Sequence, residues 1–256
     1  GDLAARQDGD EIGREHDVLD VHAARLDVVA REVLLDVGLG CRLNLAESER
    51  IRAMLEAALR RSFGDWREGA PPSVLPAAPA EFLQLALIDT PDAPPSSIRL
   101  AVPVPHPAHA LYFPTTIMNS LLGGAFGSRI TANIREDKGY SYSPDSSISA
   151  RRGTALWVMS AEVTTEHTAD ALTEIYREID RLQREAPPAP ELNAIKAYRA
   201  GLFVISNSSP NGVLGQLAFM DLHGLPPEFL TGWVASVHGV TAQQVSEIAA
   251  RFIRPQ

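Results

Sequence analysis

The sequence LLGGAFGSRITANIREDKGYSYSP, residues 121–144, contains the chain reversal around which we expect the fold to be organised. Residues 131–139 resemble the last turns of a helix, and Gly139 is placed to end it in the left-handed conformation that glycine adopts readily. Lys138 lies in the last turn, where the negative end of the helix dipole favours a cation. The following segment, 140–150, predicts a strand. The stretch therefore predicts a helix, a glycine turn and a strand in direct succession.

This reversal is expected to bring Arg135 and Tyr142 together, because one precedes the helix end and the other starts the strand. Arginine offers a planar fork of five N–H donors and tyrosine a hydroxyl donor. Both donors suit the carbonyl oxygens of a bound peptide. The alternative is structural: Arg135 forms a salt bridge with a neighbour of Glu136 or with Asp137, and Tyr142 is an ordinary sheet residue. The residues alone leave both interpretations open.

Further along the chain, the hydrophobic pattern predicts paired strands between blocks of helices. Ala155, Trp157, Met159, Ala161 and Val163 alternate on one face, which is typical of a half-buried strand. Strands are expected at 82–89, 96–104, 140–150 and 154–163. Helices are expected at 108–123, 128–137, 172–182, 191–206, 211–222, 226–237 and 241–253. This order predicts an α+β fold with two layers, an antiparallel-rich sheet with helices packed on one face, and excludes a doubly wound nucleotide-binding fold.

The N-terminal quarter of the chain is predicted to be a separate region. Residues 1–66 form an N-terminal segment, a remnant or the tail of a preceding domain, with a short buried strand at 33–40 and a helix at 47–64. Residues 67–81 are rich in proline and alanine and predict a linker. Residues 82–256 then form the main domain.

The composition excludes several classes of function. A net charge of −9 offers no basic surface for nucleic acid. Cys41 is the single cysteine, so no intrachain disulfide forms. The sequence has no apolar run of about 18 residues, which a membrane helix needs, and its acidic start does not resemble a signal peptide. Many alanines and only two lysines suggest a bacterial source; the sequence does not choose between cytoplasm and periplasm.

No catalytic or metal-binding residue is predicted in this chain. None of the seven histidines has H-E-x-x-H or H-x-x-E-H spacing, so no zinc-peptidase motif is present. His106 and His109 form a loop sequence, HPAH, and are expected to be solvated; surface positions are expected for His16 and His22. Ser128 resembles a helix cap rather than a nucleophile. Cys41 resembles a small buried hydrophobe.

Residues 119–144 resemble the signature of the C-terminal, non-zinc-binding domain of the pitrilysin/insulinase family of zinc metallopeptidases. The matching elements are Asn119, Leu122-Gly123-Gly124, Ser128-Arg129-Ile130, Ile134-Arg135-Glu136 and Gly139-Tyr140-Ser141-Tyr142. Residues 61–66, 88–103 and 239–255 resemble further parts of that domain. The resemblance covers residues 47–255, whereas the first 46 residues match poorly.

The resemblance implies one half of a two-domain active site. In this family one domain binds zinc, which activates a water for peptide hydrolysis, and the other supplies an arginine and a tyrosine that hold the substrate's carbonyl groups. Arg135 and Tyr142 occupy those two positions here and are the expected substrate-binding residues. The resemblance also implies that the peptide adds as a strand to a sheet edge.

The sequence therefore predicts the non-catalytic, peptide-substrate-binding half of a zinc metallopeptidase. This half would complete the active site of a zinc-bearing H-x-x-E-H partner, either a subunit in a heterodimer or a domain of a longer chain, and would bind no cofactor itself. The alternative is a catalytically dead scaffold or assembly subunit of the same family, for instance as a homodimer. In that case the motif would survive only because the fold needs it.

Overall fold

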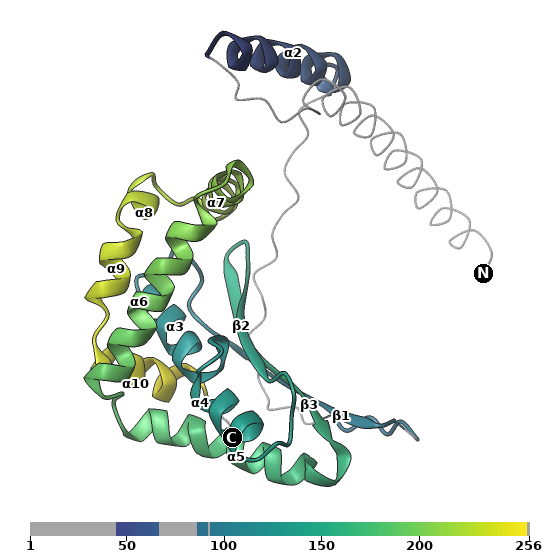
Figure 1. Ribbon diagram of the computed structural model, residues 1–256, viewed down its shortest axis with the longest axis vertical. Coiled ribbons are helices and arrows are strands. Elements are labelled where there is room, and N and C mark those ends of the chain that lie inside the picture. The colour runs from purple at the N-terminus through teal and green to yellow at the C-terminus, as the bar shows by residue number, and fades with distance from the viewer. Residues whose placement is uncertain (1–44, 67–85, 92, 255–256) are drawn as a thin grey trace, which may run out of the picture. The chain divides into compact units, whose positions relative to one another are not determined.

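The computed structural model describes residues 45–66, 86–91 and 93–254 (Figure 1). The chain divides into two compact units, residues 1–73 and 74–256. The predicted strand at 33–40 and the predicted linker lie outside the described residues. Cys41, His16 and His22 lie outside them as well.

The first unit contributes one described helix, α2 (Leu45–Phe63). The predicted helix at 47–64 is thus confirmed within two residues. It ends before Gly64, whose amide donates to the Arg60 carbonyl oxygen at 2.9 Å. A side chain at Gly64 would meet that same oxygen, so glycine suits the helix end.

The described part of the second unit contains three strands and a series of helices. The strands are β1 (Pro95–Pro103), β2 (Asp145–Arg151) and β3 (Thr154–Thr164). The helices are α3 (Tyr112–Asn119), α4 (Arg129–Thr131), α5 (Thr168–Arg184), α6 (Ala189–Ser206), α7 (Pro210–His223), α8 (Glu228–Thr231), α9 (Trp233–Gly239) and α10 (Ala242–Phe252). Two π-helical segments continue the short helices: η1 (Ser120–Gly124) follows α3, and η2 (Ala132–Asp137) follows α4. A single 3₁₀ turn, η3 (Thr165–His167), precedes α5.

The sheet is antiparallel, with β3 between β1 and β2. A tight turn at Gly153, with φ of 75°, connects β2 to β3. The five alternating residues predicted to share one face of β3 are all at most 1% exposed: Ala155, Trp157, Met159, Ala161 and Val163. The opposite face carries partly exposed side chains such as Leu156. The sheet is therefore covered on one face.

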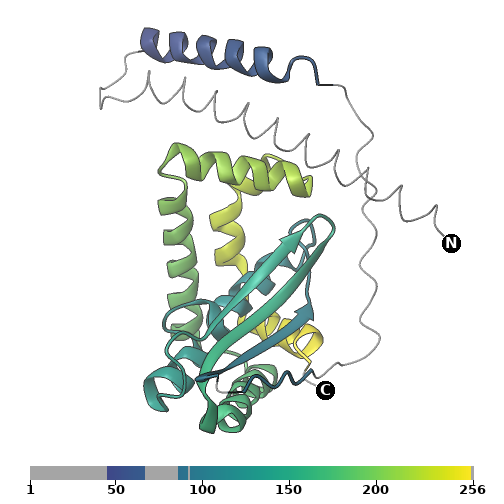
Figure 2. The same cartoon turned by 90° about the vertical axis from the view of Figure 1, so that its right-hand side faces the viewer.

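Helices cover that inner face (Figure 2). Helix α5 packs on β1 and β3 through Ala171, Ile175, Ile179 and Leu182, which are at most 1% exposed. Helices α3 and η1 lie against β2, and α10 packs on α3 and α5. Thr241 and Gln244 form a capping box at the start of α10. The two-layer α+β fold predicted from the sequence is confirmed.

Three sequence predictions need correction. Residues 86–89, the described part of the strand expected at 82–89, form no strand; Leu87 is 93% exposed and has no partner strand in the described residues. Tyr142 precedes the strand rather than starting it, since β2 begins at Asp145. The helix expected at 226–237 is two short helices, α8 and α9, which meet at Gly232.

Candidate functional site

The turn at Gly139 is built as the sequence predicts. Its φ is 67°, and its amide donates to the carbonyl oxygen of Arg135 at 3.1 Å. The Tyr140 and Ser141 amides both donate to the Ile134 carbonyl oxygen, at 2.8 and 3.2 Å. The last carbonyls of η2 are thereby satisfied, and the chain reverses sharply. The fully buried Ile134 side chain anchors the end of η2 in the core.

The chain after the turn is fixed to β3. The Ser141 hydroxyl donates to the Glu162 carbonyl oxygen at 2.7 Å, and the Thr164 amide donates to the Tyr140 carbonyl oxygen at 3.1 Å. Ser141 also pairs with Val163 as an isolated antiparallel bridge. Tyr142 follows directly and is 84% exposed. Its backbone is therefore attached to the sheet while its ring lies in solvent.

Arg135 and Tyr142 are brought together. The Arg135 Cζ atom lies 5.2 Å from the centre of the Tyr142 ring. The same atom lies 4.7 Å from the centre of the Phe126 ring, which is 72% exposed. We call Phe126, Arg135 and Tyr142 the Arg135 site. Both rings are within cation–π distance of the guanidinium, which limits the orientations it can adopt.

Phe126 is not among the site residues predicted from the sequence. The sequence around it, GGAFGS, places a bulky apolar side chain among small residues, where it is difficult to bury; this pattern could have indicated an exposed ring. An exposed aromatic ring beside an exposed tyrosine and a cation is a feature of recognition surfaces.

Both interpretations of Arg135 have support in its contacts. The Nε atom lies 3.2 Å from the Glu136 Oε1 atom, so Arg135 forms a structural ion pair, but with Glu136 itself rather than with the predicted neighbour of Glu136 or Asp137. In the described part of the chain, the two terminal amino groups of Arg135 and the Tyr142 hydroxyl have no hydrogen-bond partner. The Arg135 side chain is 28% exposed. Donors thus remain available at the surface for the oxygen atoms of a ligand.

The glycine pair positions the loop that carries Phe126. A Cβ atom at Gly123 would lie 2.6 Å from the Ser146 Oγ atom, and one at Gly124 would lie 2.4 Å from the Asn119 Nδ2 atom. The Ser146 hydroxyl donates to the Asn119 Oδ1 atom at 2.8 Å, and both residues are buried. Glycine at both positions therefore allows η1 to approach β2 closely, and the loop 125–127 leaves from this contact.

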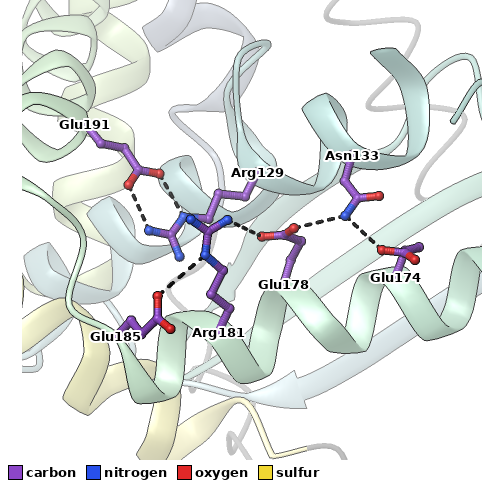
Figure 3. A network of polar contacts seen from close by, with 7 residues as sticks. All are labelled: Arg129, Asn133, Glu174, Glu178, Arg181, Glu185 and Glu191. Carbon is purple, nitrogen blue, oxygen red and sulfur yellow. Dashed lines mark hydrogen bonds and ion pairs between the residues drawn. The ribbon is translucent and has the colours of Figure 1, made fainter. Parts of the chain in front are cut away.

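A polar network fixes α4 and η2 against the helical layer (Figure 3). Arg129 donates from Nε and from a terminal nitrogen to the two carboxylate oxygens of Glu191, each at 2.8 Å. Hydrogen bonding to this carboxylate raises the pKa of Arg129. The Asn133 amide donates to Glu174 and Glu178 on α5, at 3.0 and 2.9 Å. Since Arg135 follows on η2, this network also fixes the position of the Arg135 site.

Ser128 occupies the predicted cap position, but its hydroxyl makes a different bond. It donates to the Thr131 hydroxyl at 2.9 Å and does not accept from a backbone amide. His106 and His109 lie in a loop, as predicted, and each Nδ1 atom accepts from a backbone amide two residues ahead. These contacts are local and shape the turn before α3.

The described residues contain no group of three histidine, cysteine, aspartate or glutamate side chains arranged to hold a metal ion. Among the same residues, no helix is both long enough and apolar enough to span a bilayer.

Comparison with known families decides the relationship. The family model described as the peptidase M16 inactive domain matches residues 51–198, more than half of the chain. The chain belongs to this family. The matched range contains the whole Arg135 site and the glycine pair. The resemblance to the non-zinc-binding domain of zinc metallopeptidases is thus confirmed.

Solved structures agree on the fold of this M16 inactive domain. A protease from Helicobacter pylori matches with a TM-score of 0.70 and 16% identity, over 79% of this chain and 50% of that one. An M16 inactive domain from Pseudomonas fluorescens matches with a TM-score of 0.59 and 22% identity, over 83% and 49%. A chain of complex III from Candida albicans matches with a TM-score of 0.64 and 16% identity, over 82% and 50%. The search of curated proteins gave no match.

This M16 inactive domain spans about half the length of these three relatives. At these identities the likeness establishes the fold. The family description establishes membership of the inactive, non-catalytic class of domains in a zinc peptidase family.

Proposed function

We propose that this domain is the peptide-substrate-binding half of a zinc metallopeptidase and that it completes the active site of a zinc-bearing partner. The observation that carries the proposal is the Arg135 site. An arginine whose terminal nitrogens have no partner among the described residues lies beside an exposed tyrosine at the Gly139 turn, although 7 positions separate them in sequence. Such a pair can donate to successive carbonyl oxygens of an extended peptide.

Each residue of the site has a definite task in this proposal. Arg135 donates from its terminal nitrogens to a peptide carbonyl oxygen, while Glu136 holds the Nε edge of the guanidinium. Tyr142 donates its hydroxyl to a second carbonyl oxygen. Phe126 supplies an apolar surface for a substrate side chain. Strand β2, an edge of the described sheet that begins three residues after Tyr142, offers backbone groups for pairing with the peptide.

The metal belongs to the partner in this proposal. The described residues of this chain offer no set of zinc ligands. Zinc bound by an H-x-x-E-H partner would supply the activated water for hydrolysis. The domain's own contribution is to bind and orient the peptide, which lowers the barrier through positioning.

The test is reconstitution with a zinc-bearing H-x-x-E-H partner, sought first in the adjacent reading frame. Cleavage of a fluorogenic peptide is measured for the two chains alone and mixed. Activity is expected only in the mixture. Arg135→Ala is expected to lower kcat/KM by about 10²-fold, the scale for a lost substrate-orienting contact, and Tyr142→Phe by about tenfold. Arg152→Ala, at the exposed β2–β3 turn, is the matched control.

Full activity of the Arg135→Ala and Tyr142→Phe assemblies would show that the site does not bind substrate. Circular dichroism of each variant distinguishes this result from loss of the fold.

The second candidate is a non-catalytic scaffold, in a larger assembly or as a homodimer. Two observations favour it: Arg135 has an internal ion pair with Glu136, and one structural neighbour is a chain of complex III from Candida albicans. A stable assembly with no peptide affinity, and a genome neighbourhood without a zinc-bearing relative, would favour the scaffold. One similar solved structure is a periplasmic protease from Escherichia coli. Cell fractionation would test whether this chain is found in the periplasm or in the cytoplasm.

A further inference from the structure

The helical layer contains a pocket of about 390 Å³ that the Arg135 site does not use. Its lining residues are Tyr112, Arg199, Leu202, Phe203, Ser206, Gln216, Phe219, Phe229 and Trp233. Four of them belong to α6 and are spaced i, i+3, i+4 and i+7, which places them on one face of that helix. The volume is in the usual range for sites that bind small molecules.

The walls of this aromatic pocket support one another. The Phe203 and Trp233 rings are stacked, with centres 4.4 Å apart and planes 4° from parallel. The Phe229 ring lies 6.3 Å from both the Tyr112 and the Phe219 rings. The Phe113 ring on α3 joins these two groups, with its centre 6.0 Å from that of Trp233 and 5.5 Å from that of Phe229, so rings from α3, α6, α7, α8 and α9 form one cluster. A pocket with walls fixed in this way needs little rearrangement to bind a ligand.

Arg199 is a cation without an anionic partner in this pocket. In the described part of the chain it forms no ion pair, and its buried Nε atom has no hydrogen-bond partner. Its Cζ atom lies 5.7 Å from the centre of the Trp233 ring. No lining residue is acidic. Arg129, by contrast, is paired through two bonds with Glu191.

The pKa shifts of Arg199 and Tyr112 agree with their burial in this pocket. Burial lowers the pKa of the Arg199 guanidinium from its ordinary value, and the charged form is still the relevant one because arginine stays protonated in proteins. Burial also raises the pKa of Tyr112, which keeps its hydroxyl a donor. Arg199 is partly buried, and a partly desolvated charge without a counterion gains from pairing with an anion.

We propose that the aromatic pocket binds a carboxylate carried on an apolar or aromatic body, with Arg199 pairing with the carboxylate. The planar guanidinium matches a carboxylate, and the stacked rings accommodate the apolar body. Two sources supply this chemistry: the C-terminal residue of a peptide and a free aryl-substituted carboxylic acid. Ser206 and Gln216 add polar groups that can bind the amide of a peptide source. The proposal does not depend on the peptide-binding role of the Arg135 site.

Calorimetric titration of the full chain with N-acetyl-L-phenylalanine and with its amide tests the proposal. The two probes differ only in the carboxylate. The acid is expected to bind at least about tenfold more tightly, as a charge-assisted pair in a partly buried site predicts. Arg199→Gln is expected to remove this difference, and Arg199→Lys to retain part of it, since it keeps the charge but loses the planar fork. Arg152→Gln is the control and keeps the wild-type preference.

Two further probes distinguish the sources. Tighter binding of a tripeptide ending in phenylalanine than of 3-phenylpropionate supports a peptide C-terminus, and the reverse order supports a free acid. Equal binding of N-acetyl-L-phenylalanine and its amide by the wild-type chain, or binding of neither, overturns the proposal. This comparison needs no variant, so it remains decisive even if Arg199→Gln fails to fold.

Discussion

At the scale of single residues, three arginines show how surroundings assign different roles to one side chain. Arg129 is 8% exposed and held by both oxygens of Glu191. Arg135 has one ion pair and two exposed aromatic neighbours. Arg199 lies against aromatic rings and pairs with no anion within the part of the chain that the structure describes. The first is suited to stabilising the fold, whereas the other two have donors left for a ligand.

The pair between Arg129 and Glu191 is expected to stabilise the domain measurably. Glu191→Gln removes the charge that compensates a buried guanidinium, so the free energy of unfolding should fall by about 2–3 kcal/mol. Asp180→Asn is the matched control: Asp180 also pairs at 2.8 Å, with Arg184, but both side chains are largely exposed. Its effect should stay below about 1 kcal/mol. Urea unfolding at pH 7 measures both. Equal losses of unfolding free energy in Glu191→Gln and Asp180→Asn would mean that burial does not decide how strongly an ion pair stabilises the domain.

Glu174 predicts a dependence of stability on pH. The hydrogen bond from Asn133 holds the pKa of Glu174 below its usual value. A carboxyl group with a lower pKa in the folded state stabilises the fold above its unfolded pKa, and that contribution is lost as the pH falls through the folded pKa. Wild type should therefore exceed Glu174→Gln in stability at pH 7, and the difference should shrink below about pH 4.5.

Urea unfolding at pH 7, 5, 4 and 3.5 follows this difference. Glu247→Gln, at an exposed position on α10, controls for the removal of one negative charge. A difference between wild type and Glu174→Gln that does not change with pH would contradict the assignment.

At the scale of elements, the glycine pair determines how η1 meets β2. A Cβ atom at Gly124 would lie 2.9 Å from the Ser146 carbonyl oxygen, which the sheet holds in place. Gly124→Ala should therefore destabilise the domain by about 1–3 kcal/mol, the range for overpacking. Gly201→Ala, inside α6 with nothing within 4 Å, should stabilise it by about 0.5–1 kcal/mol. Thermal unfolding compares them, and a neutral Gly124→Ala would disprove the close contact.

The elements that the sequence predicted well are those whose own pattern decides their structure. Alternation in 154–163 and the helix end at Gly139 depend on residues close together in the chain. The segment 86–89 failed because a strand needs a neighbour to pair with, and alternation cannot supply one. The single helix predicted at 226–237 was wrong for a different reason: Gly232 separates α8 from α9, although the apolar pattern continues across it.

The candidate site was predictable in part for the same reason. The Gly139 turn fixes the spacing of Arg135 and Tyr142, so their approach could be anticipated from local sequence. Phe126 reaches Arg135 only because η1 packs on β2, and the pocket around Arg199 needs rings from five helices. Both arise from tertiary contacts that no local spacing encodes.

At the scale of the whole molecule, one cluster of buried hydrophobic residues between Ile98 and Ile253 forms the main core of the described residues. It unites the inner face of the sheet with α3, α5, α9 and α10. This core belongs to the second of the two compact units. A unit that contains its own core can fold independently.

We therefore predict that a fragment of residues 82–256 folds without the N-terminal segment. Its circular dichroism should show a cooperative thermal transition with a midpoint within about 3 °C of the full chain's, equivalent to about 1 kcal/mol. The fragment should also retain the preference of the aromatic pocket for the acid over the amide, because all its lining residues lie at 112–233. Loss of cooperative unfolding in the fragment would show that residues 1–81 contribute to the core. The boundary predicted near 67–81 would then separate parts of one folding unit rather than two.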